Sequence, residues 1–334
     1  MKEHGKYIRS TSLPPPGWNR WHTLSYSRNV IEVRELTKYY DGLAAVDHIS
    51  FEVEEGEVFG FLGPNGAGKT TTVRMLTGVI KPGSGSVSIM GFDIRRDPIK
   101  AKQIAGVVPD LSNAYSELSA WDNLQFMAEL YGVPGTDARK RAEELLTKFD
   151  LYDRKDHKVK TFSKGMKQKL VIAMSLMNDP EILFLDEPTS GLDVQSARLI
   201  KEMVRELNND GKTVFLTTHY MEEANDLCNR IAIINHGTIV AIDAPEKLKM
   251  RIGGLQRVEV SFDTPVDVSC FHSISGVISV RRSGDKLRFY TNEPGRVIYQ
   301  LVDYSRSNNL EIVMLTTLTP TLEDVFVKLT REQK

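Results

Sequence analysis

The chain has 334 residues, a formal net charge of −1, 41% hydrophobic residues and 26% charged residues. These values are ordinary for a globular protein, and they exclude a whole-chain electrostatic field that would attract nucleic acid. The length accommodates one large and one small domain. The two cysteines, Cys228 and Cys270, lack the spacing of a zinc site or a redox pair. We interpret them as small buried hydrophobes in a protein of a reducing compartment.

Residues 1–29 form the first segment, in which charged residues, three consecutive prolines and two tryptophans follow one another without periodicity. This composition predicts a poorly ordered extension. It lacks the continuous apolar stretch of a signal peptide or membrane anchor. No run elsewhere approaches the ~20 apolar residues that cross a bilayer. We therefore expect a cytoplasmic protein.

Residues 30–252 alternate strand patterns with helical ones. Turn-forming glycines separate short runs rich in Val, Ile, Leu and Phe, which predict strands at 30–36, 49–53, 58–62, 104–108, 182–185, 213–217, 231–234 and 238–241. Residues 69–76 read as a helix, and residues 121–180 have helical character, with a helical subdomain at about 111–180. This order predicts an α/β fold with a largely parallel sheet and an antiparallel edge.

The composition shifts near Gly253 and Gly254, where we place a linker. Beyond it, the pattern predicts strands at 258–262, 277–281, 286–291 and 311–315 and helices at 295–307 and 322–329. Thr321 and Asp324 have the spacing of a helix cap. Residues 253–334 thus form a predicted small α+β domain. Whether it regulates a dimer or is a packing appendage stays open.

A glycine-rich loop follows the apolar strand at 58–62 and opens the helix at 69–76, the context that a phosphate-binding P-loop requires. Backbone amides of such a loop and the positive end of the helix bind phosphates, Lys69 reaches the β- and γ-phosphates, and the Thr70 hydroxyl ligates Mg²⁺. The predicted ATP-binding residues here are Gly63, Pro64, Asn65, Gly66, Ala67, Gly68, Lys69, Thr70 and Thr71.

Two acids, Asp186 and Glu187, end the apolar strand that begins at Ile182. Ligands of open α/β sheets bind at the carboxyl ends of the strands, so both acids are expected beside the phosphates. Adjacent strand residues face opposite ways, which allows two roles. We predict that Asp186 contributes to the Mg²⁺ shell and that Glu187 is the general base for the attacking water.

Further motifs resemble those of one particular family of ATPases. Phe162–Met166 looks like the signature sequence of ABC (ATP-binding cassette) ATPases, Ser190–Asp193 like their D-loop, His219 like their switch histidine and Tyr40 like their adenine-stacking aromatic. The resemblance covers roughly residues 30–245 and implies a P-loop NTPase of the ABC cassette fold. It also implies that Ser163, Lys164 and Gly165 contact the ATP held by the other subunit of a dimer that sandwiches two nucleotides, that Asp193 contacts ATP, and that His219 senses the γ-phosphate.

The motifs depart from the family's pattern in three places. Lys164 replaces a usual glycine, Met166 replaces a usual glutamine, and Asp110 stands where the family has the Mg²⁺-contacting glutamine of the Q-loop. Aspartate is shorter and charged, but it can hold the ion directly or through water. Our hypothesis is that Asp110 keeps this metal-binding and coupling role.

The signature variant, the carboxyl-terminal extension and the motif at 321–326 together resemble ATPase subunits of drug exporters of the daunorubicin-resistance type. This resemblance implies an ATPase that uses ATP and Mg²⁺, pairs as a homodimer (or with a paralogous subunit) and energises a separate polytopic membrane permease from the cytoplasmic face. Residues 111–131, with Tyr115, Trp121, Phe126 and Met127, would receive the permease. An importer ATPase and a soluble ABC protein of translation or DNA repair remain alternatives. The cargo cannot be read from these residues.

Overall fold

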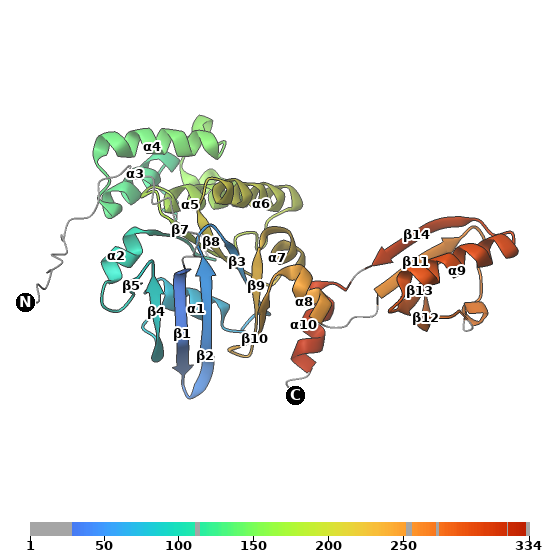
Figure 1. Cartoon of the computed structure of the whole chain (residues 1–334). Coiled ribbons are helices and arrows are strands. Elements are labelled where there is room, and N and C mark those ends of the chain that lie inside the picture. Colours follow the sequence, from blue (N-terminus) through green and yellow to red (C-terminus); the bar gives the residue numbers. More distant parts are fainter. Residues whose placement is uncertain (1–28, 111–113, 252–255, 272–273, 319, 332–334) are drawn as a thin grey trace, which may run out of the picture.

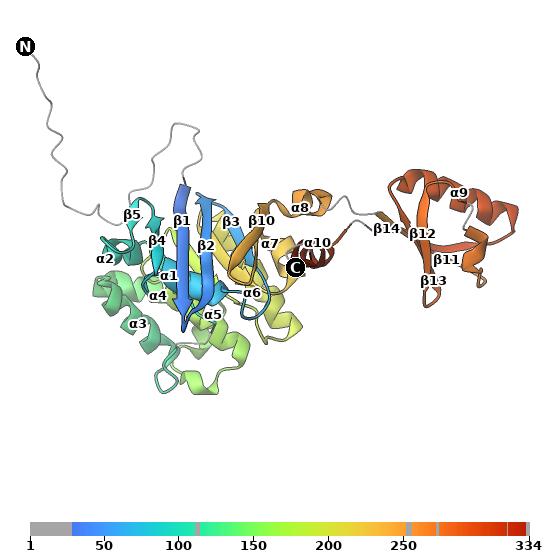
Figure 2. The same cartoon turned by 90° about the horizontal axis from the view of Figure 1, so that it is seen from below.

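The computed structural model describes residues 29–110, 114–251, 256–271, 274–318 and 320–331, and the predicted extension 1–29 lies outside them except for Asn29. Three sheets organise this part of the chain (Figure 1). Two of them, with the helices around them, form the larger unit, which we call the cassette and which includes the residues of the domain predicted at 30–252 that the structure describes. The third belongs to a small unit near the carboxyl terminus, which both views show to one side of the cassette (Figures 1 and 2).

The first sheet is antiparallel and has the order β2-β1-β4-β5. Its strands are β1 (Asn29–Tyr40), β2 (Leu43–Glu54), β4 (Ser84–Ile89) and β5 (Phe92–Asp93). The first two are longer than predicted because they pair as a hairpin up to Tyr40 and Leu43, beyond their apolar stretches. β4 and β5 have no apolar run that predicts a strand, since serine and glycine dominate the start of β4 and β5 has two residues.

The central sheet has the order β10-β9-β3-β8-β7-β6 and is parallel except for β10. Its strands are β3 (Val58–Leu62), β6 (Ala105–Val108), β7 (Ile182–Asp186), β8 (Thr213–Thr218), β9 (Arg230–Asn235) and β10 (Thr238–Asp243). Every residue of β3, β7 and β8 is buried. These three neighbours therefore carry their carboxyl ends to one edge of the sheet, where the predicted functional residues follow them.

Helices cover the central sheet and build the helical subdomain, which Figure 1 shows above the sheet as α3 and α4. They are α1 (Lys69–Leu76), α2 (Pro98–Gln103), α3 (Ala120–Tyr131), α4 (Gly135–Lys148), α5 (Lys164–Ser175), α6 (Val194–Asn209), α7 (Met221–Leu227) and α8 (Pro245–Arg251). Among the described residues, no helix is both long and apolar enough to cross a membrane. Cys228 is buried as predicted, but Cys270 is exposed, so that part of the prediction is wrong: Cys270 lies in a short 3-10 turn at the surface of the small unit, of which only Phe271 is buried.

The small unit is a four-stranded antiparallel sheet, order β12-β13-β11-β14, with α9 (Pro294–Ser307) packed against it. Its strands are β11 (Gln256–Phe262), β12 (Val277–Ser283), β13 (Lys286–Thr291) and β14 (Ile312–Leu318). Inward-facing residues alternate along β13, as expected for a sheet with one covered face. Phe289 of β13 packs with Phe271 and with Leu301 of α9 in a hydrophobic core that is separate from those of the cassette.

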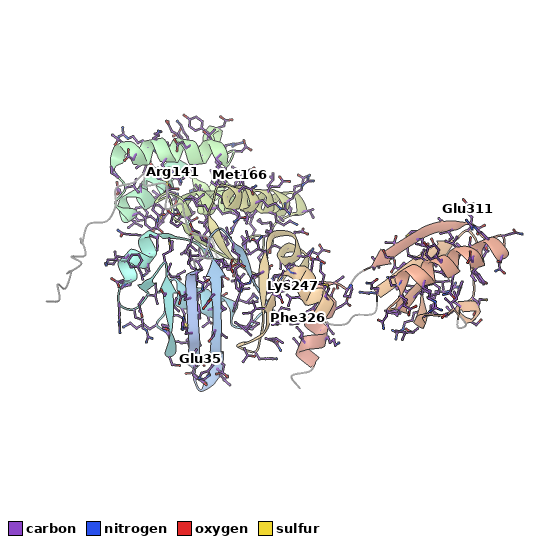
Figure 3. All side chains as sticks on the ribbon, in the orientation of Figure 1. Glu35, Arg141, Met166, Lys247, Glu311 and Phe326 are labelled. Carbon is purple, nitrogen blue, oxygen red and sulfur yellow. The ribbon has the colours of Figure 1, made fainter. Side chains whose placement is uncertain are left out.

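The last helix, α10 (Leu322–Arg331), packs against the cassette instead of the small sheet, which differs from the predicted grouping of residues 253–334. Leu322 and Val325 are buried in the hydrophobic core of the cassette, and α10 contacts α7 and α8. Figure 3 labels Phe326 on α10 near Lys247 of α8, far from Glu311 of the small unit. The apolar stripe of α10 is thus buried against the larger hydrophobic core, which is that of the cassette.

The start of α10 is fixed by the predicted cap. The Asp324 amide donates to the Thr321 hydroxyl at 3.2 Å, and the Thr321 amide donates to the Asp324 carboxylate at 2.9 Å. This reciprocal pair confirms the cap that the spacing predicts. Asp324 also forms an ion pair with Arg257 of β11. This ion pair therefore connects the small unit to α10, which itself packs on the cassette.

Candidate functional site

The glycine-rich loop connects β3 to α1 with a backbone that only glycine supports. Gly66 and Gly68 have φ angles of +80° and +107°. A β-carbon on Gly68 would lie 2.4 Å from the carbonyl oxygen of Ala45, so no larger residue fits there. Gly66 has open space around it and needs glycine for its φ angle alone. At these two positions the loop backbone is therefore not covered by side chains of its own, and it lines the pocket that is described below.

Lys69, the first residue of α1, folds its side chain back under the loop. Its ammonium donates to the carbonyl oxygens of Gly63 at 2.8 Å and Pro64 at 3.0 Å. It also lies 3.0 Å from Glu187 Oε1. Lys69 is only 5% exposed, and a buried ammonium is tolerated only with such partners.

Glu187 follows β7 and lies between two groups that can bind anions. One carboxylate oxygen faces Lys69, and the other is 2.9 Å from His219 Nδ1. Its φ of +50° is uncommon for a residue with a side chain, and such backbone strain is often found at functional sites. The Glu187 amide donates to the Thr217 carbonyl oxygen at 3.1 Å, which ties it to the end of β8.

Asp186, at the end of β7, is 3% exposed and lies below the glycine-rich loop. Burial raises the pKa of its carboxyl, the hydroxyls of Thr217 and Thr70 oppose this shift, and the negative charges of Asp110 and Glu187 add to it. The Thr217 hydroxyl donates to Asp186 Oδ1 at 2.5 Å. A carboxylate in this environment gains from a cation placed beside it.

These side chains surround one open pocket of about 370 Å³. It is lined by Ala45, Asn65, Gly66, Gly68, Lys69, Thr70, Thr71, Asp110, Glu187, Ser190 and His219. The structure thus brings the predicted loop, the strand-end glutamate, the histidine and Asp110 together. The pocket lining does not include the predicted site residues Gly63, Pro64, Ala67 and Asp186.

The oxygen donors near the pocket fit a small divalent cation. Thr70 and Asp110 line the pocket, and Asp186 interacts with both. The described residues contain no cluster of three or more His, Cys, Asp or Glu side chains suited to a metal. Mg²⁺ needs no such cluster, because it is usually held by one or two carboxylates together with substrate phosphates and water. The donor set therefore fits a magnesium ion that arrives with a phosphate ligand.

Tyr40 ends β1 and does not line this pocket. Its ring is 46% exposed, with the Lys38 ammonium 5.4 Å from the ring centroid. One face of the ring is therefore covered by a cation, and the side chain remains accessible for stacking.

The signature residues lie elsewhere in the chain's structure. Ser163 caps α5 by accepting a hydrogen bond from the Met166 amide at 3.2 Å. A β-carbon on Gly165 would meet the Ser196 hydroxyl at 2.5 Å, so α5 and α6 approach closely here. Asp193 caps α6 by accepting from the Ser196 amide at 2.8 Å. Ser163, Lys164, Gly165 and Asp193 thus lie together, and none of them lines the pocket of their own chain.

The comparisons with known proteins identify the family. A family model described as "ABC transporter" matches residues 46–190. The linearmycin resistance ATP-binding protein LnrL of Bacillus subtilis is 37% identical over 305 residues, which cover 90% of this chain and 98% of that protein. This chain belongs to the ABC transporter ATP-binding family. It is an ATPase subunit of the ABC type.

Two further relatives of this ABC ATPase have similar coverage. The Nod factor export ATP-binding protein I of Ralstonia nicotianae is 37% identical and covers 91% of this chain and 94% of its own length. The daunorubicin/doxorubicin resistance ATP-binding protein DrrA of Streptomyces peucetius is 36% identical and covers 90% and 92%.

Solved structures confirm the ABC cassette fold. The structure of an ATP-binding subunit of an ABC transporter superposes with a TM-score of 0.62 at 29% identity, over 67% of this chain and 93% of that one. A dimeric cassette bound to ADP and Pi in a post-hydrolysis state has a TM-score of 0.58 at 29% identity, over 64% and 98%. Both leave about a third of this chain unmatched.

Sequence reasoning missed several residues of the ABC site. Thr217 orients Asp186, and Thr189 and Glu223 form a buried hydrogen bond. Ser190, the first residue of the predicted D-loop, lines the pocket. Thr217 had a signal, because a hydroxyl near the end of a buried strand beside the acidic pair is placed for such a bond. Glu223 also had one: with Ala224 and Leu227 it has the spacing of a buried helical face, where an acid is unexpected.

Proposed function

We propose that this ABC ATPase energises an exporter: two copies, or one copy and a paralogous subunit, close around two ATP molecules and drive a separate polytopic permease from the cytoplasmic face of the membrane. The names of the relatives support export, because they describe resistance proteins and an export protein. The observation that carries the dimer is the position of Ser163, Lys164 and Gly165. None of these residues lines the pocket of its own chain, and the exposed side chains of Ser163 and Lys164 at the start of α5 are accessible to the nucleotide of another chain.

In the proposed site, the loop amides and Lys69 bind the β- and γ-phosphates. Backbone donors and a buried ammonium in a fixed cradle need no reorganisation when the anion arrives. The hydroxyl of Thr70 and the carboxylates of Asp186 and Asp110 would hold Mg²⁺. When bound, the ion neutralises phosphate charge and helps to fix the phosphate orientation. We keep the hypothesis that Asp110 replaces the usual Q-loop glutamine.

Glu187 is the proposed general base, and His219 the group that contacts the γ-phosphate. Both of the groups that pair with Glu187 here, Lys69 and His219, are suited to phosphate binding. Phosphate therefore competes with the Glu187 carboxylate for the same donors. When the phosphate takes them over, Glu187 is free to accept a proton from water, which couples nucleotide binding to activation of the base.

Across the proposed dimer axis, the Ser163 hydroxyl, Lys164 and the amide of Gly165 contact the partner's γ-phosphate. The amino terminus of α5, which Ser163 caps, adds a favourable field for an anion. Lys164 in place of glycine adds a positive charge. Met166 follows on α5, where its side chain lies against the cassette core, so it offers no polar contact. Asp193 and Tyr40 are proposed to contact the nucleotide from the D-loop and the base side.

An aromatic surface on the helical subdomain is the proposed permease contact. Tyr115 is 51% exposed, and its ring meets Phe126 edge-on at 5.0 Å between centroids. Trp121 and Met127 pack partly against the core and leave part of their surface accessible. The surface adjoins Asp110 along the chain. Residues 111–113 of the predicted contact lie outside the described residues.

The shared site is tested by mixing two inactive chains. Lys69→Ala removes the phosphate lysine of one chain, and Ser163→Ala removes the signature hydroxyl of the other. In a mixed dimer one site carries both defects and the second carries neither. Random pairing is therefore expected to restore roughly one quarter of wild-type ATP hydrolysis, measured as phosphate release. A mixture no more active than its two separate components would contradict the shared site.

The exporter assignment is tested with the tagged full-length chain purified from membranes of cells that express it. We expect a polytopic membrane protein to co-purify, and Tyr115→Ala to reduce its recovery, whereas Tyr299→Ala, an exposed aromatic on α9, should not. Cells with Glu187→Gln should become more sensitive to toxic compounds that the wild type exports. Recovery of ribosomes or DNA instead, or loss of nutrient uptake in the Glu187→Gln cells, would overturn the exporter assignment.

A further inference from the structure

Glu223 is a buried acid that the roles described above do not use. It lies on α7 and is 4% exposed, on the same face as the buried residues Ala224 and Leu227. Packing of α7 against the cassette core is supplied by these apolar neighbours. A leucine at this position would fill the space without the penalty of burying a carboxyl, so packing alone does not explain an acid here.

One hydrogen-bond partner of the carboxyl lies on the segment that follows β7. Glu223 Oε1 accepts a hydrogen bond from the Thr189 hydroxyl at 2.8 Å, and Thr189 is itself 6% exposed. Glu223 Oε2 has no hydrogen-bond partner among the described residues. Burial raises the pKa of Glu223, and the hydroxyls of Thr218 and Thr189 and the charge of Lys201 oppose that shift. The bond to Thr189 is therefore a buried contact whose loss is not compensated by solvent.

The two ends of this bond lie on two different parts of the site. α7 begins two residues after His219, so Glu223 lies on the helix that directly follows the switch histidine. Thr189 lies two residues after Glu187, immediately before Ser190 of the pocket. The Thr189 carbonyl accepts a hydrogen bond from the Leu192 amide at 3.2 Å, and Asp193 then caps α6. One hydrogen bond thus connects the segment after β8 to the loop at 189–193.

We propose that Glu223 is a positioning residue for ATP hydrolysis: through Thr189 it fixes the loop at 189–193 relative to His219, and so links the nucleotide in one site to Asp193 and the partner's site. This inference rests on the proposed two-fold dimer. When His219 gains or loses its phosphate contact, the start of α7 shifts with it. The buried bond passes that displacement to the loop instead of allowing the two segments to move separately.

The test compares variants that keep the volume but remove the bond. Glu223→Leu removes the acceptor, Thr189→Val removes the donor, and Glu223→Gln keeps an acceptor for Thr189. Glu222→Leu is the matched control, because Glu222 is its exposed neighbour on α7. The measurements on the full-length protein are kcat, KM for ATP, the Hill coefficient for ATP and the thermal midpoint.

We expect Glu223→Leu and Thr189→Val each to lower kcat about tenfold, the effect of one buried charge-assisted hydrogen bond, with KM nearly unchanged. The Hill coefficient should fall towards 1. The double variant should be no more than about twofold slower than Glu223→Leu, because both changes break one contact. The kcat of Glu223→Gln should stay within about threefold of the wild-type value. The kcat of Glu222→Leu should equal the wild-type value.

A purely structural role would produce a different pattern: lower thermal midpoints with unchanged kcat and Hill coefficient per folded molecule, or additive effects in the double variant. Either result would overturn the inference. Size-exclusion chromatography of Glu187→Gln with and without ATP shows whether a dimer forms. It therefore distinguishes failure of the proposed dimer from failure of the proposed role of Glu223. If no dimer forms, the proposed two-fold dimer fails. If it forms and Glu223→Leu still has wild-type kinetics, only the role of Glu223 fails.

Discussion

Replacing Glu187 with glutamine is expected to slow ATP hydrolysis by about 10²- to 10⁴-fold, the range for loss of a general base. Glutamine has nearly the same shape but cannot accept a proton from water. It also removes the negative charge that pairs with Lys69 at 3.0 Å and His219 at 2.9 Å. Phosphate then no longer competes with a carboxylate for these groups, so the affinity for ATP should be unchanged or higher.

Single-turnover hydrolysis and equilibrium ATP binding measure the two expected effects of Glu187→Gln separately. Glu222→Gln, the same substitution at an exposed position, should leave both values at wild-type levels. In size-exclusion chromatography with Mg-ATP, Glu187→Gln should accumulate as a dimer because hydrolysis no longer separates the subunits. A hydrolysis rate within tenfold of the wild type would remove Glu187 from the role of general base.

Replacing Lys69 with alanine is expected to abolish most nucleotide binding. The truncation of one partner in a buried charge contact typically costs about 2 to 5 kcal/mol, or roughly a 30- to 4000-fold weaker Kd. The ammonium is held by two backbone carbonyls and is 5% exposed, so neither solvent nor a neighbouring side chain replaces it. The change also leaves the Glu187 carboxylate with His219 alone, and its charge then repels phosphate.

Titration calorimetry with Mg-ATP measures the loss in Lys69→Ala, and the thermal midpoint without nucleotide shows whether the fold is kept. Lys69→Ala combined with Glu187→Gln is the informative control, because it removes the lysine without leaving a carboxylate that lacks its partner. We expect weak Mg-ATP binding in both variants. The thermal midpoint should be lowered in Lys69→Ala, where Glu187 lacks its partner, and recover in the double variant. An affinity of Lys69→Ala within threefold of the wild type would contradict the phosphate-binding role.

Much of the site was predictable from the sequence because its parts are local. The loop at 63–70 needs glycines at fixed positions, and the structure shows why at Gly66 and Gly68. An apolar strand that ends in two acids places Asp186 and Glu187 at the edge of the sheet whatever surrounds them. Short-range steric and hydrogen-bonding constraints of this kind are written in consecutive residues, so a single sequence reveals them.

Contacts between distant segments were not predictable. The ion pair of Lys69 with Glu187 and the bond of Thr189 with Glu223 join residues that are far apart in the chain. Periodicity gives the buried face of a helix but not the element that covers it. For the same reason α10 was assigned to the small domain, although Leu322 and Val325 belong to the cassette core.

The sequence by itself determined the cassette fold, the phosphate loop, the acidic pair and the family resemblance, because each depends on neighbouring residues and their spacing. Only the tertiary structure decided that Glu187 is held between two phosphate-binding groups, that the signature residues lie away from their own chain's pocket, and that α10 covers the cassette. These features depend on which surfaces meet when strands and helices pack, and burial of apolar area selects those surfaces only in the folded chain.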